Sequence, residues 1–254
     1  MAGRGDRRVA LVTGASYGLG AATALAFAQD GYDVAITELK PDDLNATIAK
    51  IEGAGSRALP LALDLRSQPS IDDVVAKTVA EFGRLDVLAN NAGGILVKKA
   101  VEITPAEWQP LIDINITGTF FLTQRVGRHM IETKTPGSIV TVCSVHGIIG
   151  VPNVALYGIT KAALAQMTRM LAIEWAEHGI RLNGVAPGRL VTESPARART
   201  TFDPAYIARM TEATPLKRLA TVEEVAAAMA YLASPRANSV TGHILVLDGG
   251  LTVA

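Results

Sequence analysis

Short apolar runs alternate along this chain with longer segments of helical periodicity. Between the runs, apolar residues recur every three or four positions, as at Ile71, Val75 and Val79, which predicts helices. The runs themselves are apolar nearly throughout, which is typical of strands covered on both faces. They predict strands at Val9–Thr13, Val34–Thr37, Ala58–Leu63, Leu85–Ala89, Ser138–Ser144, Arg181–Ala186 and Ile244–Leu247.

This alternation predicts an α/β fold of the doubly wound Rossmann type. Strands that alternate with helices pair in parallel through right-handed crossovers, so we expect a seven-stranded parallel sheet with helices on both faces. The elements use nearly the whole chain, which predicts one domain over residues 1–254 with its core at about residues 8–251. Two helix starts carry capping signals, Thr104 to Glu107 and Thr221 to Glu224.

Composition and charge narrow the class of protein. The chain has 254 residues, 49% of them hydrophobic and 19% charged, a globular composition. Its 24 Lys and Arg balance 24 Asp and Glu, which argues against nucleic acid or an anionic membrane as partner. No stretch has the ~20 apolar residues of a membrane span. With Cys143 as its only cysteine and no His or Cys at metal-ligand spacing, we expect a soluble cytoplasmic protein without a metal.

A glycine-rich loop follows the first predicted strand and opens a helix. Glycines at such a place allow a tight turn and let the backbone approach a pyrophosphate, which the helix amino terminus then binds. Position directly after a strand makes this signal much stronger than a glycine cluster alone. The loop residues expected to contact a dinucleotide are Gly14, Ser16, Tyr17, Gly18, Leu19 and Gly20.

The acid at the end of the second strand bears on the choice of cofactor. Glu38 lies eighteen residues beyond Gly20, where a carboxylate can accept hydrogen bonds from the adenosine ribose and repel a 2′-phosphate. Neither Tyr17 nor Leu39 is basic, which favours NAD. Because Lys40 is basic and close to Glu38, NADP stays an alternative cofactor. In the alternative interpretation of Glu38, the carboxylate is only a solvated charge at a strand end.

Candidate chemistry lies in the second half of the chain. Tyr157 and Lys161 are four residues apart at the start of a predicted helix, so both project from one face. A phenol has a pKa near ~10 in water, and a neighbouring ammonium group lowers it toward the range of a useful base. Ser144, at a strand end, can hydrogen-bond the oxygen of a substrate.

Together these motifs resemble the short-chain dehydrogenase/reductase family, in its single-domain branch of about 250 residues. The resemblance covers about residues 8 to 251 and departs from the family at no position of the catalytic tetrad. It is carried by the glycine loop Thr13 to Gly20, Asn90-Asn91-Ala92-Gly93, the tetrad Asn115, Ser144, Tyr157 and Lys161, the pair Asp64-Leu65, Pro187-Gly188 with Leu190 and Thr192, and Asp248-Gly249-Gly250.

The resemblance implies a role for each tetrad residue in an oxidoreductase. Tyr157 is the general acid or base on the substrate oxygen, and Lys161 lowers its pKa and holds the nicotinamide ribose. Ser144 orients and stabilises the reacting group, and Asn115 holds a water that connects Lys161 to solvent.

The resemblance also implies further cofactor contacts and an assembly. Two helices, Tyr157 to Ala176 and the one after Asn115, build a homotetramer in the family. The contacts beyond the glycine loop and Glu38 are expected from Asp64, Leu65, Asn90, Tyr157, Lys161, Pro187, Gly188, Leu190 and Thr192.

The substrate is a small molecule whose identity stays open. We expect a secondary alcohol or ketone, such as a sugar or polyol, with His146 and Asn153 as candidate contacts beside Ser144 and Tyr157. The alternative is an NADPH-dependent 3-oxoacyl-carrier-protein reductase, and a third hypothesis is a cofactor-binding protein without turnover.

Two sets of residues have both a functional and a structural interpretation. Cys143 is interpreted as a buried packing residue rather than a nucleophile. The segment between Pro187 and Pro215 is interpreted as a solvated lid. The alternative is that its arginines form an anion-binding wall for a phosphorylated, carboxylated or carrier-bound substrate. The arginines that would form such a wall are Arg189, Arg197, Arg199 and Arg209.

Overall fold

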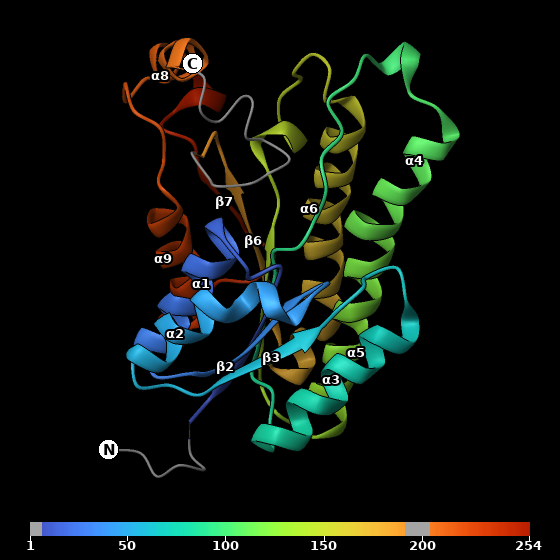
Figure 1. Ribbon diagram of the computed structural model, residues 1–254, viewed down its shortest axis with the longest axis vertical. Helices are drawn as coiled ribbons and strands as arrows, with labels where there is room; N and C mark the ends of the chain where they lie inside the picture. The colour runs from blue at the N-terminus through green and yellow to red at the C-terminus, as the bar shows by residue number, and fades with distance from the viewer. Residues whose placement is uncertain (1–6, 191–203) are drawn as a thin grey trace.

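The computed structural model describes residues 7–190 and 204–254 and contains the predicted sheet (Figure 1). Seven strands pair in parallel in the order β3-β2-β1-β4-β5-β6-β7. The strands are β1 Val9–Thr13, β2 Asp33–Glu38, β3 Ala58–Ala62, β4 Val87–Asn90, β5 Ser138–Val142, β6 Arg181–Pro187 and β7 Ile244–Leu247.

All seven predicted strands are present, and two of them differ noticeably in their bounds. β4 begins at Val87 because the side chain of Asp86 turns to the start of β1, where it accepts a hydrogen bond of 2.8 Å from Val9 N. β5 ends at Val142 because Ser144 already caps a short 3-10 turn, with its Oγ accepting from His146 N at 3.2 Å.

The helices begin and end close to their sequence signals. Both predicted capping boxes are confirmed, at Thr104 with Glu107 and at Thr221 with Glu224. The α-helices are α1 Gly18–Gln29, α2 Asn45–Gly53, α3 Gln68–Phe82, α4 Pro105–Ile112, α5 Thr119–Glu132, α6 Ala155–Trp175, α8 Pro204–Ala213 and α9 Val222–Ala233. The shorter turns are η1 Pro41–Leu44, η2 Ala100–Glu102, the π-helical η3 Asp113–Gly118, η4 Val145–Gly147, η5 Ala176–His178, η7 Pro235–Ala237 and η8 Leu251–Val253.

Helices cover both faces of the sheet, as Figure 1 shows. Alternate residues of β1 point to opposite faces: Ala10 and Val12 pack with the cluster that holds Phe27 of α1 and Met229 of α9. Leu11 packs instead with the cluster under α3, α5 and α6. Complete burial of a side chain such as Phe27 stabilises the fold by about 1.5–3 kcal/mol.

The parallel direction of the strands places chemistry at one edge of the sheet. β1 leads into the glycine loop, β2 ends at Glu38, β5 leads to Ser144, and β6 ends at Pro187. In open parallel sheets, ligands bind in the crevice beyond these carboxyl ends.

Among the described residues, no helix is both long and apolar enough to cross a membrane.

Candidate active site

The glycine loop has the shape that a dinucleotide pyrophosphate requires. Gly14 and Gly18 adopt φ values of +64° and +56°, which side chains disfavour. A Cβ on Gly20 would overlap the carbonyl oxygen of Gly14 and lie 2.6 Å from Asn91 Nδ2. Tyr17 precedes α1 in an extended conformation and makes no capping hydrogen bond, which suits an anion at this helix terminus.

Asn91 holds the glycine loop in place, a role that the sequence did not reveal. Its Nδ2 donates to the carbonyl oxygens of Thr13 at 3.0 Å and Gly14 at 2.9 Å. In return, Thr13 Oγ1 accepts from the backbone N–H groups of Asn91 and Ala92, both at 3.0 Å. The only sequence signal was the position of Asn91 within the motif that follows β4.

A cavity of about 260 Å³ lies beside this loop and brings together several predicted cofactor residues, Gly14, Glu38, Asp64 and Leu65 among them. Glu38 accepts from Ser16 Oγ at 2.7 Å and from Leu39 N at 3.0 Å. Asp64 receives two hydrogen bonds from the guanidinium of Arg66, at 2.9 and 2.8 Å. These bonds lower the pKa of Asp64 below its ordinary value.

Two other predicted cofactor residues use their side chains inside the protein. Asn90 Nδ2 donates to Thr123 Oγ1 at 2.8 Å and to Thr141 Oγ1 at 3.3 Å. The side chain of Leu19 is buried in the core over the α1 face of the sheet. Contacts from these two residues to a cofactor would therefore come from other atoms, the backbone above all.

Tyr157, Lys161 and Ser144 meet at the start of α6. Tyr157 and Lys161 lie on consecutive turns and are 7% and 4% exposed. Lys161 Nζ is 5.7 Å from the centre of the Tyr157 ring and donates to the carbonyl oxygen of Val142 at 2.6 Å. Ser144, 7% exposed, lies two residues beyond the end of β5 and caps η4, which packs against α6. A buried ammonium beside a phenol is the arrangement that favours a phenolate.

Asn115 connects three parts of the site from a π-helical turn between α4 and α5. Its Oδ1 accepts from Gly94 N at 2.7 Å, and its Nδ2 donates to Gly94 O at 3.0 Å and to Thr160 Oγ1 at 2.9 Å. Thr160 is the residue before Lys161 on α6. A Cβ added to Gly93 would lie 3.1 Å from Asn115 Oδ1 and 3.8 Å from Lys161 Nζ, so the two tetrad residues flank this glycine. Single-turn π-helices are frequent at functional sites.

The two candidate substrate residues lie in different settings. The His146 ring stands edge-on to the Tyr157 ring, with centroids 5.8 Å apart. Asn153 has a φ of +65° and is exposed, and its carbonyl oxygen accepts from Lys98 N at 2.7 Å. His146 therefore adjoins the catalytic tyrosine, whereas Asn153 ties down the segment after β4 through its backbone.

The predicted nicotinamide segment is described as far as Leu190. Gly188 N donates to Leu247 O at 2.9 Å, and the buried Leu190 forms a bridge with Ala220. Thr192, Arg197 and Arg199 lie outside the described residues.

The two remaining arginines of the predicted lid share one aromatic ring. The guanidinium groups of Arg189 and Arg209 lie 4.3 and 5.3 Å from the centre of the Tyr206 ring on α8. Such cation–π contacts hold both charges beside α8, on the lid side of the sheet.

Cys143 is a packing residue, as its sequence context predicted. The thiol is 2% exposed and packs with Leu164 and Ala186. Burial raises the pKa of Cys143 to about 11, so the thiolate needed for nucleophilic attack is scarce at neutral pH.

The described residues fit a nicotinamide dinucleotide. The glycine loop closes too tightly to admit a side chain at Gly20, which would overlap the carbonyl oxygen of Gly14, and Glu38 lines the adjoining cavity. Comparison with known proteins agrees. A family model described as Enoyl-(Acyl carrier protein) reductase matches residues 14–252. The chain belongs to the short-chain dehydrogenase/reductase family.

Relatives within this family are named dehydrogenases and reductases. The chain is 37% identical to 3beta-hydroxysteroid dehydrogenase 1 of Eggerthella lenta, covering 97% of this chain and 94% of that one. It is also 37% identical to a 3-oxoacyl-[acyl-carrier-protein] reductase of Thermotoga maritima, covering 98% and 99%. The structure of a gluconate 5-dehydrogenase from Burkholderia cenocepacia with NADP and tartrate superposes with a TM-score of 0.90, at 31% identity and 97% and 96% coverage.

The protein is therefore an oxidoreductase that transfers a hydride between a nicotinamide cofactor and a secondary alcohol or ketone. This finding removes the hypothesis of a cofactor-binding protein without turnover.

Proposed function

We propose that this short-chain dehydrogenase/reductase is an NAD-dependent dehydrogenase of a small polar secondary alcohol, such as a sugar or polyol, with Tyr157 as general acid and base. The observation that carries the catalytic assignment is the buried cluster of Tyr157 and Lys161 beside Ser144. Cofactor and substrate meet in one domain, at the carboxyl ends of the strands.

The tetrad residues handle the proton and the substrate oxygen. A bound nicotinamide would supply the hydride chemistry, as acceptor during alcohol oxidation and as donor during ketone reduction. Tyr157 Oη removes the hydroxyl proton during oxidation and returns it during reduction. The charge of Lys161 favours the phenolate, and the Ser144 hydroxyl donates to the oxygen as its charge develops.

Asn115 supports proton exchange through its backbone. Its side-chain amide already makes three hydrogen bonds to Gly94 and Thr160. A π-helical turn shifts the backbone hydrogen-bond pattern, which leaves a carbonyl able to bind water. We place the water that connects Lys161 to solvent at this carbonyl.

The preference for NAD rests on charge at the ribose end of the cofactor cavity. Glu38 is held there by Ser16 and by the backbone of Leu39. Arg66, the cationic side chain among the cavity-lining residues, is engaged by Asp64. Among the described residues that line the cavity, a 2′-phosphate would thus meet Glu38 and an arginine that Asp64 already engages. Lys40 is exposed and lies outside this lining.

Fluorescence titration with NADH and NADPH tests this preference. The wild type is expected to bind NADH about tenfold or more tightly than NADPH. This ratio corresponds to one charge-assisted hydrogen bond from the ribose to Glu38, together with the repulsion that Glu38 exerts on a 2′-phosphate. Glu38→Ser should reduce that ratio. Asp42→Ser removes the same charge from an exposed position outside the cavity lining and serves as the matched control. Tighter binding of NADPH by the wild type overturns the proposal and moves the carrier-protein reductase to first place.

Two observations bear on the substrate. The imidazole of His146 beside Tyr157 offers a polar contact that suits a hydroxyl-rich substrate. The relative from Thermotoga maritima favours the alternative, a 3-oxoacyl-carrier-protein reductase. Turnover of polyols, sugars and sugar acids with NAD, measured against turnover of a 3-oxoacyl thioester with NADPH, distinguishes the two functions.

We further propose a homotetramer in the cytoplasm. Phe121 on α5 and Met170 and Ile173 on α6 are 39%, 51% and 78% exposed, and exposed apolar side chains on neighbouring helices suit a subunit interface. Without a second cysteine, Cys143 has no internal disulfide partner, which suits a reducing compartment. Cell fractionation tests the location.

A further inference from the structure

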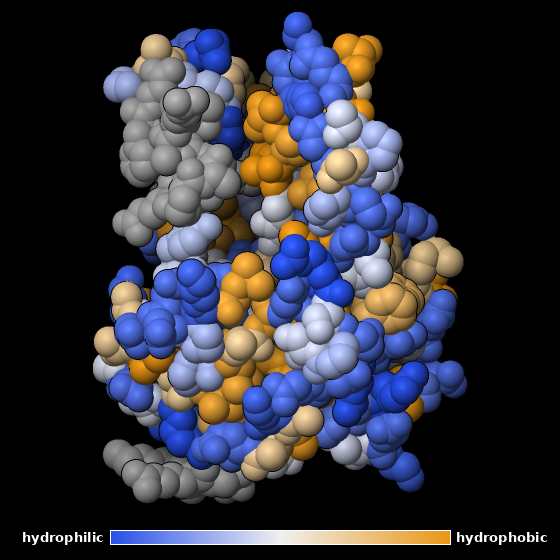
Figure 2. Space-filling model, turned by 45° about the vertical axis from the view of Figure 1, so that its right-hand side comes forward, coloured by the Kyte–Doolittle hydropathy of each residue, from blue (hydrophilic) through white to orange (hydrophobic). Residues whose placement is uncertain are grey.

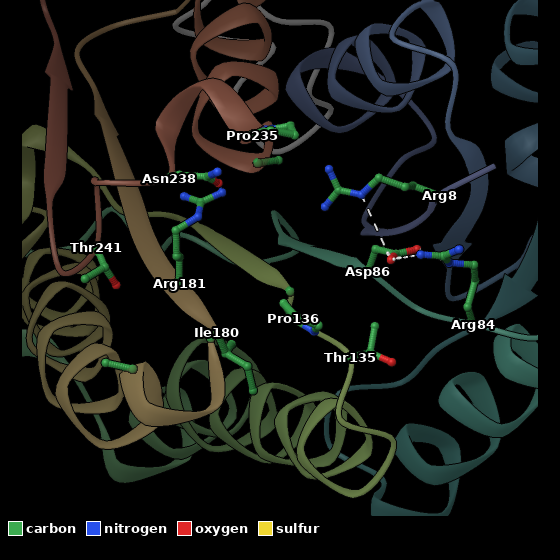
Figure 3. A pocket seen from close by; sticks show the side chains of 14 residues that line it. Arg8, Arg84, Asp86, Thr135, Pro136, Ile180, Arg181, Pro235, Asn238 and Thr241 are labelled. Atoms are coloured by element: carbon green, nitrogen blue, oxygen red, sulfur yellow. Dashed lines mark hydrogen bonds and ion pairs between the residues drawn. The ribbon is translucent and has the colours of Figure 1, made fainter. Parts of the chain in front are cut away.

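A cavity of about 610 Å³ lies at the edge of the sheet opposite the active site (Figure 3). It opens beneath the amino ends of β1, β4, β5 and β6, because Arg8, Asp86, Gly137 and Arg181 stand at or just before those strand starts and line it. The end of α9 and the turn η7 close another side, where Asn238 lies. Cavities of this size hold small-molecule ligands.

Positive charge is in excess in this cavity. Its described lining contains three guanidinium groups, from Arg8, Arg84 and Arg181, and one carboxylate, Asp86. That carboxylate is 2% exposed and already accepts three hydrogen bonds. Arg84 donates two of them, at 2.8 and 2.7 Å, and Val9 N donates the third at 2.8 Å. Arg8 Nε lies 4.0 Å away from it. The cavity therefore has two positive charges more than its carboxylate balances.

The other two arginines make their hydrogen bonds to uncharged groups. Arg181 donates to the carbonyl oxygens of Leu232 at 2.8 Å, Val240 at 3.2 Å and Ser234 at 3.2 Å. Burial, and after it the charge of Arg8, lowers the pKa of Arg181, which still stays cationic. Arg8 donates to Tyr32 Oη at 2.8 Å. Asp86, 4.0 Å from Arg8 Nε, is the single carboxylate in the described lining and is shared with Arg84, so an anion between Arg8 and Arg181 would add charge-assisted bonds to both.

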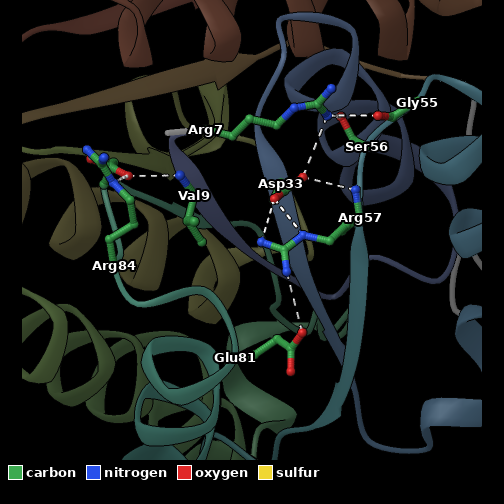
Figure 4. Close-up of polar contacts among 9 residues, drawn as sticks. Arg7, Val9, Asp33, Gly55, Ser56, Arg57, Glu81 and Arg84 are labelled. Atoms are coloured by element: carbon green, nitrogen blue, oxygen red, sulfur yellow. Dashed lines mark hydrogen bonds and ion pairs between the residues drawn. The ribbon is translucent and has the colours of Figure 1, made fainter. Parts of the chain in front are cut away.

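The same edge of the sheet shows what a balanced arrangement looks like (Figure 4). Buried Asp33, at the start of β2, accepts from Arg57 Nε at 2.8 Å and pairs with Arg7 at 3.7 Å. Arg57 also reaches Glu81 at 3.6 Å, so two arginines share two carboxylates. The excess of positive charge is thus a property of the cavity and not of the whole edge.

We infer that this cavity binds a small polyanion, a phosphate ester or a polycarboxylate, between Arg8 and Arg181 with Asn238 beside them. Guanidinium groups bind both oxyanions through short charge-assisted bonds. Figure 3 shows Arg181, with Asn238 next to it, and Arg8 on opposite sides of the opening. The site is separate from the pyrophosphate site, which lies at the opposite ends of the strands.

Calorimetric titration of the holoenzyme with inorganic phosphate, and separately with citrate, tests the inference. The enzyme is first saturated with whichever of NADH and NADPH it binds more tightly, so that the pyrophosphate site is filled, and ionic strength is held constant with NaCl. Arg8→Gln should weaken binding about tenfold or more, the effect of losing one charge-assisted bond. Arg7→Gln, which removes the same charge from the neighbouring residue outside the cavity, should change affinity less than twofold.

A second variant tests the same site if Arg8→Gln fails to fold. Asn238 is exposed and its side chain is not part of the core, so Asn238→Glu places a carboxylate among the arginines without removing a buried contact. We expect this variant to melt at a higher temperature without added anion and to lose phosphate and citrate binding. The tighter of the two anions identifies the ligand class. Equal affinities for Arg7→Gln and Arg8→Gln, or no binding of either anion by the wild type, overturn the inference.

Discussion

At the scale of single residues, catalysis depends on a phenol whose surroundings are supplied by two segments far apart in the chain. Tyr157 and Lys161 come from α6, whereas the carbonyl that accepts from Lys161 Nζ belongs to Val142 at the end of β5. This bond orients the ammonium group beside the Tyr157 ring. The buried cation can therefore act on the tyrosine while one of its three N–H donors is held by Val142.

Tyr157→Phe is expected to abolish proton transfer and little else. Because the ring is retained, packing against His146 is preserved and the fold should melt within about 2 °C of the wild type. Turnover should fall by about 10²–10⁴-fold, the usual contribution of a positioned acid or base. Thermal denaturation measures the first effect and steady-state kinetics the second. Retention of more than a tenth of the activity would contradict the role of Tyr157.

Cys143 is expected to be inert in the folded protein. With a pKa of about 11 in place of an ordinary thiol value, the thiolate is roughly a hundredfold scarcer at pH 8, and burial blocks access as well. Iodoacetamide should label Cys143 at least a hundredfold more slowly in the folded enzyme than in guanidinium chloride. Mass spectrometry follows the labelling, and rapid modification of the native protein would refute the packing role.

At the scale of elements, a charged clasp ties the segment after β4 to α4 at the mouth of the site. Lys98 Nζ donates to both oxygens of Glu107, at 2.7 and 2.8 Å, while Lys98 N donates to Asn153 O at 2.7 Å. Glu107 also accepts from the backbone and hydroxyl of Thr104 as part of the capping box. One carboxylate thus caps α4 and fixes a loop near Tyr157.

The clasp should weaken in acid. Hydrogen bonds from Lys98, followed by those from Thr104, lower the pKa of Glu107 to about 2 from an ordinary value of 4.5. Because the folded-state pKa is depressed, the stabilisation is complete above about pH 4.5 and is lost as the pH falls toward 2. The melting temperature of Glu107→Gln should therefore lie below that of the wild type at pH 6, with the gap narrowing below pH 4.5. A gap that is constant with pH would show that the effect is not ionic.

The elements themselves were predictable to within a few residues, and their long-range contacts were not. The apolar runs located all seven strands, and the tetrad spacing located Tyr157 and Lys161 on one helix face. The role of Asn91 depends on Thr13 and Gly14, almost eighty residues earlier, and the bonds of Asn115 depend on Gly94 and Thr160. Local periodicity contains no information on such partners, because β1 and β4 become neighbours only in the sheet.

At the scale of the whole molecule, the parallel sheet separates two kinds of site. Substrate chemistry lies at the carboxyl ends, and Figure 2 shows hydrophobic side chains gathered on the inner side of the upper right part of the molecule. The amino ends hold buried Asp33 and Asp86 with their arginine partners, beside the cavity proposed to bind an anion. The apolar residues exposed on α5 and α6 belong to neither edge, which is consistent with the tetramer proposed above.

Ile173→Glu is expected to disrupt that assembly. Ile173 is 78% exposed on α6, and its burial in an interface would contribute about 1.5–3 kcal/mol, whereas a carboxylate there would be desolvated without a partner. The dissociation constant should rise at least tenfold, which sedimentation velocity detects as dimers or monomers at micromolar concentration. Val101→Glu, at a valine that is 93% exposed on η2, makes the same chemical change away from α5 and α6 and should leave the tetramer intact. Since the Tyr157 face of α6 points inward, the dissociated variant should still bind cofactor. A wild type that sediments as a monomer would instead mean that these apolar residues serve another partner.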